Sequence, residues 1–195
     1  MIAEFAARSP GRTRAWDCGT GNGQAAYLVA EHFDEVVATD PSRRQLEHAR
    51  PHPRVRYQVA TEDATGLETA SVDLVTAAQA LHWLDLDRFY AEVERVLVPN
   101  GLLAVWCYAR ARIRPAIDEV VDWFHDTRMA PFWPVERRHV LTGYRELPFP
   151  FAEISVGPWT MSLDYSRSRF LEYVATWSAV KAARDAEAMD PMADL

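Results

Sequence analysis

The chain lacks any run of about 18 apolar residues, which is the length that a helix needs to cross a bilayer. Its first twelve residues, MIAEFAARSPGR, carry charges at Glu4 and Arg8 and have no uninterrupted apolar core. A secretory signal peptide needs such a core, so we do not expect one here. These two absences lead us to expect a cytoplasmic protein that does not insert into a membrane.

Cysteine is scarce as well, because Cys18 and Cys107 are the only two in 195 residues. They lie far apart and fit no metal-ligand spacing, so the sequence indicates neither a disulfide framework nor a metal site. Two thiols without a partner pattern are typical of a reducing compartment.

Basic residues are the minority charge. The chain has 28 acidic and 21 basic residues, a formal net charge of −7, and Lys181 is its only lysine. A nucleic-acid backbone or an anionic membrane surface needs a basic patch, so we expect neither as the main partner. The same balance is compatible with a cationic small-molecule ligand.

What is present is a pattern of short apolar strands separated by amphipathic helical segments. At about 100–200 residues per domain, the length predicts a single domain over residues 1–195. Several of the strands are nearly continuous apolar runs, as expected for a parallel sheet that is covered on both faces. The predicted strands are Thr13–Cys18, Glu35–Thr39, Val55–Val59, Val72–Ala77 and Leu102–Tyr108. The predicted helices between them are Gln24–His32, Arg43–Arg50 and Leu86–Leu97.

Residues 1–108 therefore predict an α/β fold with an open, doubly wound and mostly parallel sheet, which binds ligands at the carboxyl ends of its strands. Residues 109–195 have a different character and predict a helical appendage, rich in proline and aromatic residues, on the same domain. We expect helices over 117–128 and 168–182, an irregular cover over 130–151, and a strand over 154–163.

A glycine loop follows the first predicted strand. Asp17, Gly19, Gly21 and Gly23 alternate there with other residues, and alternate glycines let a backbone turn sharply and approach a ligand. A dinucleotide site has the spacing G-x-G-x-x-G, whereas the third glycine here comes one residue early. The Asp17 carboxylate would also repel a pyrophosphate, so the loop favours a cationic ligand without phosphate and disfavours a nicotinamide dehydrogenase.

Acidic residues also follow the second and third predicted strands. Asp40 closes the second strand, where a carboxylate can accept hydrogen bonds from ribose hydroxyls, although it could equally begin a helix. Glu62 and Asp63 follow the third strand, where one of them could accept a hydrogen bond from an adenine amine or simply lie in a solvated loop. The three positions predict one crevice at the edge of the sheet.

These residues resemble the class I S-adenosylmethionine-dependent methyltransferases. The resemblance rests on the glycine loop with Asp17, on Asp40, on Asp63-Ala64, and on Pro99-Asn100-Gly101 before the fifth strand. Three further segments resemble the small-molecule branch that includes trans-aconitate methyltransferases: residues 79–83 (QALHW), 85–90 (DLDRFY) and 176–179 (TWSA).

The resemblance implies an enzyme that binds S-adenosyl-L-methionine and methylates a small-molecule acceptor. It implies that Asp17 and the glycine loop hold the methionine part, Asp40 the ribose, and Asp63 and Ala64 the adenine, with Glu62 beside them. Members of this branch begin with about thirty further residues and end with a closing strand, so we expect a chain that is short at both ends. Asn100 stands where members of this family usually have a glycine. This substitution is mild, because asparagine tolerates a left-handed conformation.

The sequence says less about the residues that would bind the methyl acceptor than about those that would bind the cofactor. A carboxylate acceptor needs no general base, whereas a phenol, thiol or carbon acid does, and His82 is the base candidate after the fourth strand. The aromatic residues Trp83, Trp106, Tyr108 and Tyr144 are candidates for the acceptor pocket. Each has a structural alternative: His82 could bond a backbone carbonyl, and the tryptophans could belong to the core. We expect O-methylation of a carboxylate, with a non-catalytic cofactor-binding or partner domain as the alternative; the oligomeric state stays open.

Overall fold

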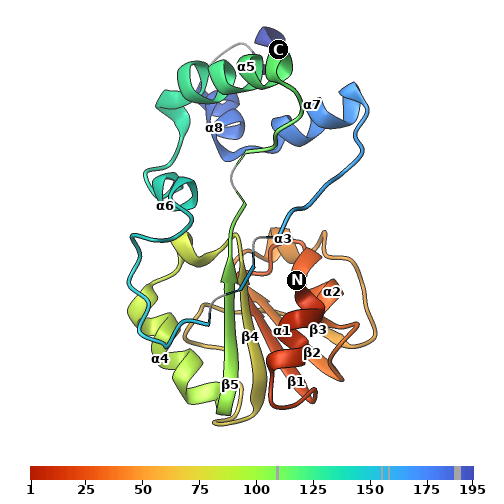
Figure 1. The fold of residues 1–195 in the computed structure, drawn as a ribbon, viewed down its shortest axis with the longest axis vertical. Helices are drawn as coiled ribbons and strands as arrows, with labels where there is room; N and C mark the ends of the chain where they lie inside the picture. The colour runs from red at the N-terminus through yellow and green to blue at the C-terminus, as the bar shows by residue number, and fades with distance from the viewer. Residues whose placement is uncertain (109, 155, 158, 187–189) are drawn as a thin grey trace. The chain divides into compact units, whose positions relative to one another are not determined.

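A computed structural model describes residues 1–108, 110–154, 156–157, 159–186 and 190–195. The chain divides into two compact units (Figure 1). Unit 1 comprises residues 1–108 and 139–154, and unit 2 comprises residues 109–138 and 155–195. This differs from the predicted division, because residues 139–154 pack with the α/β core instead of with the appendage. A single domain over 1–195 stays a prediction.

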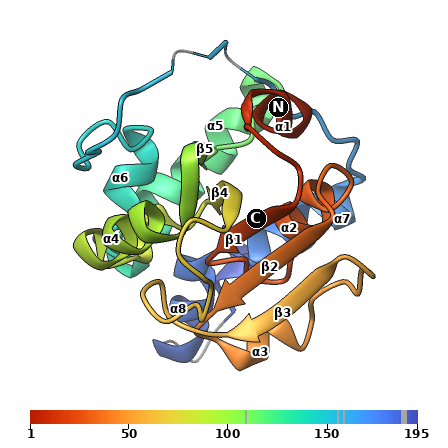
Figure 2. The same cartoon turned by 90° about the horizontal axis from the view of Figure 1, so that it is seen from below.

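Unit 1 is built on one parallel sheet with the strand order β3-β2-β1-β4-β5. Figure 2 shows these strands from below, with β3 and β5 at the two edges. The strands are β1 (Arg14–Cys18), β2 (Glu35–Asp40), β3 (Val55–Val59), β4 (Val72–Ala78) and β5 (Leu97–Trp106). All four neighbouring pairs are parallel, so the prediction of a doubly wound α/β sheet is confirmed.

Both faces of the sheet are buried, because successive side chains of a strand point to opposite faces. Trp16 packs on one face with Phe89 and Val93 of α4 (Leu86–Val96). Ala15 packs on the other with Phe5 and with Val29 of α2 (Gln24–Val29). Two-sided burial explains why the strands read as continuous apolar runs.

The helix α1 (Ile2–Arg8) was not predicted. The ring centroids of its Phe5 and of Trp106 in β5 lie 5.6 Å apart. We therefore attribute this short helix to tertiary packing and not to a periodic pattern in its sequence. The predicted helix over 43–50 is shorter, since α3 ends at Leu46 (Arg43–Leu46). Asn100 has a φ of 62°, the left-handed conformation that asparagine tolerates.

Unit 2 is helical, and its core contains Phe124, Met129, Val174 and Val180. Its helices are α5 (Pro115–Trp123), the π-helix η2 (Phe124–Arg128), the short η3 (Ala130–Phe132), α7 (Arg167–Ala175), α8 (Ser178–Ala186) and η4 (Pro191–Asp194). The helix α6 (Arg137–Leu141) spans the division between the units.

Two predictions for the second half were wrong. The predicted strand over 154–163 is not formed in its described residues, where Ile154, Met161 and Leu163 are more than half exposed and pair with no neighbouring strand. Ser155 and Pro158 lie outside the described residues. The predicted helix over 168–182 is two helices, because the chain breaks at Thr176 and Trp177 between α7 and α8. No described helix is long and apolar enough to span a membrane.

Candidate functional site

The glycine loop connects the carboxyl end of β1 to α2, and Gly19, Gly21 and Gly23 all have a left-handed backbone. Gly19 has a φ of 65°, and a Cβ there would lie 2.6 Å from the Cβ of Ala80, so only glycine fits. Gly21 has a φ of 59°, but a Cβ there would meet no atom within 4 Å. The backbone at Gly21 therefore borders open space.

Asp17 is fully buried beneath this loop rather than exposed to a ligand. One carboxylate oxygen accepts from the Thr20 hydroxyl at 2.5 Å, and the other accepts from the Thr76 hydroxyl of β4 at 2.6 Å. Thr20 in turn donates its backbone N–H to the carbonyl of Thr39 at 2.9 Å. Asp17 thus joins β1, the loop and β4, and Thr20 ties the loop to β2.

Burial raises the pKa of Asp17 to about 6. Hydrogen bonds from Thr20, Thr76 and the backbone of Ala26 in α2 oppose this rise, and the nearby negative charge of Asp40 adds to it.

Asp40 lies at the carboxyl end of β2, next to β1 in the sheet, and is 9% exposed. One oxygen accepts from the backbone N–H of Gly21 at 2.8 Å, and the other accepts from the backbone N–H of Ser42 at 2.8 Å. Each carboxylate oxygen has a second lone pair, so Asp40 can still accept from a ligand. The helix-capping alternative does not describe Asp40, because Ser42 caps α3.

The residues after β3 lie at the third position of the same edge. The Glu62 carboxylate accepts from the backbone N–H of Asp85 at 3.1 Å. Asp63 is exposed, and its oxygens accept from the Thr61 hydroxyl at 2.7 Å and from Arg88 at 3.2 Å. The Thr61 hydrogen bond lowers the pKa of Asp63. Ala64 is exposed beside it.

His82 follows β4 and lies against Tyr144, although 62 residues separate them in the chain. Nδ1 of His82 is 2.9 Å from the Tyr144 hydroxyl, and the ring centroids are 5.8 Å apart. Tyr144 is 9% exposed and has a φ of 64°, which is uncommon for a residue other than glycine. The contact between His82 and Tyr144 joins two predicted site residues.

The other predicted pocket residues differ in exposure and in the neighbours of their rings. Trp83 is 56% exposed and lies beside His82, with ring centroids 4.8 Å apart. Trp106 packs against Phe5 of α1, in the core on the face of the sheet that α2 covers. Tyr108 is 47% exposed. Trp106 therefore fits the core alternative, and Trp83 does not.

Gln79 is the first residue of the motif at residues 79–83. Its side chain has a structural role at the end of β4. Its φ is 56°, and its side-chain oxygen accepts from the Tyr108 backbone N–H at 2.9 Å. Its amide nitrogen donates to the Tyr108 carbonyl at 3.3 Å. Gln79 thus continues the β4–β5 pairing beyond the last residues of the two strands. Thr20 and Thr76 were also missed, because a threonine in a strand or a loop carries no sequence signal of its partner.

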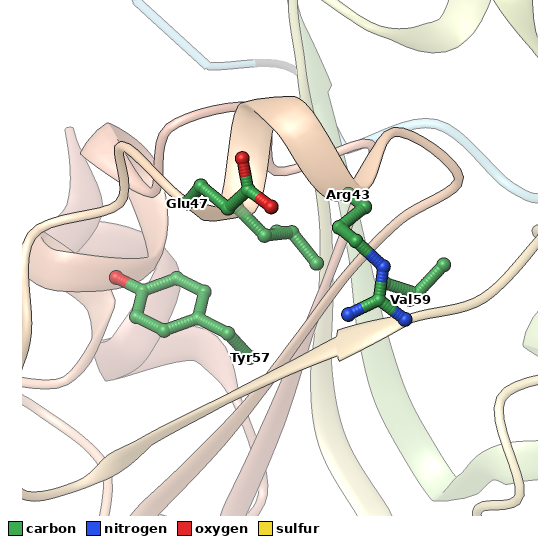
Figure 3. A pocket seen from close by; sticks show the side chains of 5 residues that line it. Arg43, Glu47, Tyr57 and Val59 are labelled. Carbon is green, nitrogen blue, oxygen red and sulfur yellow. The ribbon is translucent and has the colours of Figure 1, made fainter.

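A hollow of about 390 Å³ lies between α3 and β3 (Figure 3). Arg43, Glu47 and Leu46 line it from the helix side, and Tyr57 and Val59 line it from the strand. It contains none of the predicted site residues, although Val59 is the register partner of Asp40. Among the described residues, no group of three or more His, Cys, Asp or Glu side chains could hold a metal ion.

Comparisons with known proteins agree with this geometry. A family model described as a methyltransferase domain matches residues 16–105. The solved structure of a candidate type II methyltransferase from Anaeromyxobacter dehalogenans is 45% identical, with a TM-score of 0.89, and the match covers 99% of this chain and 82% of that one.

Two curated relatives carry the same kind of name. A candidate methyltransferase of Dictyostelium discoideum is 31% identical over 174 residues, which cover 88% of this chain and 66% of the relative. A candidate S-adenosylmethionine-dependent methyltransferase of Saccharomyces cerevisiae is 35% identical over 100 residues, 47% of this chain and 34% of the relative. The chain therefore spans less than two thirds of either curated relative. Neither name specifies an acceptor, and the trans-aconitate branch stays a prediction. The matches over most of this chain, together with the sheet and the loop, place it in the class I, S-adenosylmethionine-dependent methyltransferase family.

Proposed function

We propose that this chain transfers a methyl group from S-adenosylmethionine to a small-molecule acceptor, and that the accepting group is a carboxylate oxygen. The observation that carries the proposal is the arrangement of Asp40 at the end of β2. Its carboxylate is fixed by the N–H groups of Gly21 and Ser42, and the loop beside it, residues 17–23, contains no basic residue. Such an edge suits a ligand with hydroxyls and positive charge and without phosphate.

The residues present fit this cofactor. Asp40 retains lone pairs for the two hydroxyls of a ribose, and the open space at Gly21 would admit a ligand close to the backbone. We propose that Asp17 acts indirectly, since its two oxygens already accept from Thr20 and Thr76. It would position the glycine loop that holds the methionine part.

We assign the adenine side to Asp63 and Ala64, with Glu62 as a support. Asp63 is exposed and held in one orientation by Thr61 and Arg88, so a lone pair of its carboxylate can face an exocyclic amine. Glu62 accepts from the N–H of Asp85 and so fixes the segment after β3 to the start of α4.

The bound cofactor supplies a methyl group that its sulfonium already activates. The chain's task is then to exclude water and to align the acceptor oxygen, and alignment of this kind lowers a barrier by about 7–11 kcal/mol. A carboxylate is ionised at neutral pH, so no residue has to remove its proton. For an acceptor that must lose a proton, His82 is the base that we assign, with Tyr144 holding its Nδ1.

We assign Trp83, Tyr108 and Tyr144 to the acceptor side, because Trp83 and Tyr108 expose large aromatic surfaces in unit 1 and Tyr144 lies against His82. Trp106 was predicted there too, but its ring packs on Phe5. We also propose a cytoplasmic setting, which suits a chain in which no disulfide joins Cys18 and Cys107.

Transfer of a radiolabelled methyl group to a panel of carboxylic acids tests the proposal. Methyl esters of carboxylates release methanol in mild alkali, whereas methylated amines and phenols do not, so alkali-labile label identifies the acceptor group. Asp40→Ala is the negative control. Binding of S-adenosylhomocysteine by calorimetry without turnover on any acid would favour a non-catalytic cofactor-binding domain instead.

A further inference from the structure

His125 is buried in unit 2 with one ring nitrogen paired and the other not. Its side chain is 3% exposed, and its Nδ1 lies 2.8 Å from a carboxylate oxygen of Asp126. Its Nε2 is buried and has no hydrogen-bond partner among the described residues. A buried polar atom without a partner costs free energy, so its retention calls for an explanation.

The neighbours of His125 determine which nitrogen carries the proton. The Asp126 carboxylate is held by two hydrogen bonds from Arg110, at 2.7 and 2.9 Å, and an ionised carboxylate can only accept. Nδ1 of His125 is therefore the N–H donor to Asp126, and Nε2 of the neutral ring presents a lone pair. Burial lowers the pKa of His125, which keeps the ring neutral at pH 7.

Two indole rings pack against the ring of His125. The centroid of Trp133 lies 4.5 Å from that of His125, and the centroid of Trp177 lies 5.5 Å away with its plane at 76°. The indole N–H of Trp133 donates to the backbone carbonyl of His125 at 2.9 Å, so that indole is held in place. His125 and Asp126 also lie in the π-helix Phe124–Arg128, a rare backbone form that is frequent at functional sites.

We propose that these four side chains, His125, Asp126, Trp133 and Trp177, form a binding site for a small aromatic molecule that carries a hydroxyl group. We call this group the His125 site. The hydroxyl of the ligand donates to Nε2 of His125, and its ring packs against the two indoles. Because Nε2 is buried, entry of the ligand requires one of the indoles to turn aside.

The lone pair on Nε2 cannot bind a carboxylate, which is itself only an acceptor. A carboxylate elsewhere on the same molecule would stay outside the His125 site.

The test uses a pair of probes that differ by one hydroxyl group, 4-hydroxybenzoate and benzoate. Both are titrated into the full chain, which is saturated with S-adenosylhomocysteine and labelled with ¹⁵N at its six histidines. We expect 4-hydroxybenzoate to bind about tenfold more tightly, which corresponds to about 1.4 kcal/mol. It should shift the Nε2 resonance of His125, whereas benzoate should not. Equal affinities, or a resonance that shows only an internal water, would overturn the proposal.

Two substitutions separate recognition from packing. His125→Asn keeps an amide that can donate to Asp126 and removes Nε2, so it should abolish the preference for the hydroxyl. His125→Gln keeps a polar group near the Nε2 position and should restore part of the preference. His48→Asn, at an exposed histidine beside α3, is the matched control and should change nothing.

If His125→Asn does not fold, the probe pair on the unaltered chain and on His125→Gln still decides the matter. A preference that survives in His125→Asn would also overturn the proposal. The binding measurement needs no turnover, so failure of methyl transfer and failure of the His125 site are seen separately.

Discussion

The carboxylate of Asp40 accepts the backbone N–H of Gly21 at 2.8 Å, so an acid at the end of β2 fixes the turn that follows β1. The same carboxylate is assigned to the ribose. We predict that Asp40→Ala weakens binding of S-adenosylhomocysteine by about 10- to 100-fold, since loss of a partner for buried polar groups costs about 1–3 kcal/mol. Calorimetry measures the change.

Asp34→Ala is the control for Asp40→Ala, because Asp34 is exposed and lies just before β2. Its affinity for S-adenosylhomocysteine should match that of the unaltered chain. Thermal unfolding without ligand checks that Asp40→Ala still folds. A folded Asp40→Ala variant with unchanged affinity would remove Asp40 from the ribose site.

We predict that the titration of Asp17 lowers the stability of the chain as pH rises. Its pKa is about 6 in the folded chain and near its usual value of about 4 in the unfolded chain. Between these values the folded state binds the additional proton, so the contribution of Asp17 to the free energy of unfolding falls as pH rises from about 4 to about 6. The fall should reach about 2–3 kcal/mol, at about 1.4 kcal/mol per pKa unit.

Asp17→Asn removes this titration, and the Thr20 and Thr76 hydroxyls can both donate to and accept from an amide. We therefore expect Asp17→Asn to gain stability relative to the unaltered chain as pH rises, measured by urea denaturation at pH 4.5 and pH 7.5. Other carboxylates titrate equally in both proteins and cancel in the difference. A difference that is the same at both pH values would contradict the assignment.

The sequence predicted the sheet well because two-sided burial leaves a direct record in apolar runs. It also predicted that Asp17, Asp40 and Asp63 lie at the ends of neighbouring strands, which the strand order β3-β2-β1 confirms. It could not predict that Asp17 is enclosed. Spacing places a residue at the end of a strand, but the direction of its carboxylate depends on Thr76, 59 residues away in β4.

The second half was predicted less well for a physical reason. The alternating residues of 154–163 have the pattern of a strand, but a strand needs a neighbouring strand to pair with, and periodicity says nothing about the neighbour. Likewise, the return of residues 139–154 to unit 1 depends on contacts such as that of Tyr144 with His82, which link positions 62 residues apart. Local patterns carry no information on such contacts.

We predict that breaking the contact between Tyr144 and His82 slows methyl transfer to some acceptors and leaves cofactor binding unchanged. Tyr144→Phe removes the hydroxyl from Nδ1 of His82 and keeps the ring. We expect binding of S-adenosylhomocysteine to stay within about twofold, because neither residue is assigned to the cofactor. For acceptors that must lose a proton, kcat should fall about 10- to 100-fold, which is less than the roughly 10²–10⁴-fold effect of an acid–base group because the imidazole itself remains.

A double-mutant cycle with His82→Ala checks whether these two residues act together. If Tyr144 acts through His82, Tyr144→Phe should have no further effect on kcat in the His82→Ala background. Carboxylate acceptors should be nearly unaffected by either change and serve as the internal control. Additive effects of the two substitutions would show that Tyr144 does not act by positioning His82.

We predict that Glu92 in α4 stabilises the fold at a position outside the candidate cofactor site. Its carboxylate is 7% exposed and accepts from the Thr65 hydroxyl and from Arg95, which also donates to the Leu67 carbonyl at 2.8 Å. Burial opposes its ionisation, but hydrogen bonds from Arg95 and Thr65 outweigh burial and hold the pKa of Glu92 below its usual value. We expect Glu92→Gln to lower the free energy of unfolding by about 1–2 kcal/mol, less than for a fully buried pair, because Arg95 is 39% exposed.

The loss in Glu92→Gln should be present at pH 7 and shrink as pH falls through the lowered pKa of Glu92, where the carboxylate of the unaltered chain becomes protonated. Glu94→Gln is the matched control on the same helix, since Glu94 is exposed, and it should change stability by less than about 0.5 kcal/mol. Urea denaturation of both variants measures the difference. Equal stabilities of Glu92→Gln and Glu94→Gln at pH 7 would show that the network does not hold the segment after β3 against α4.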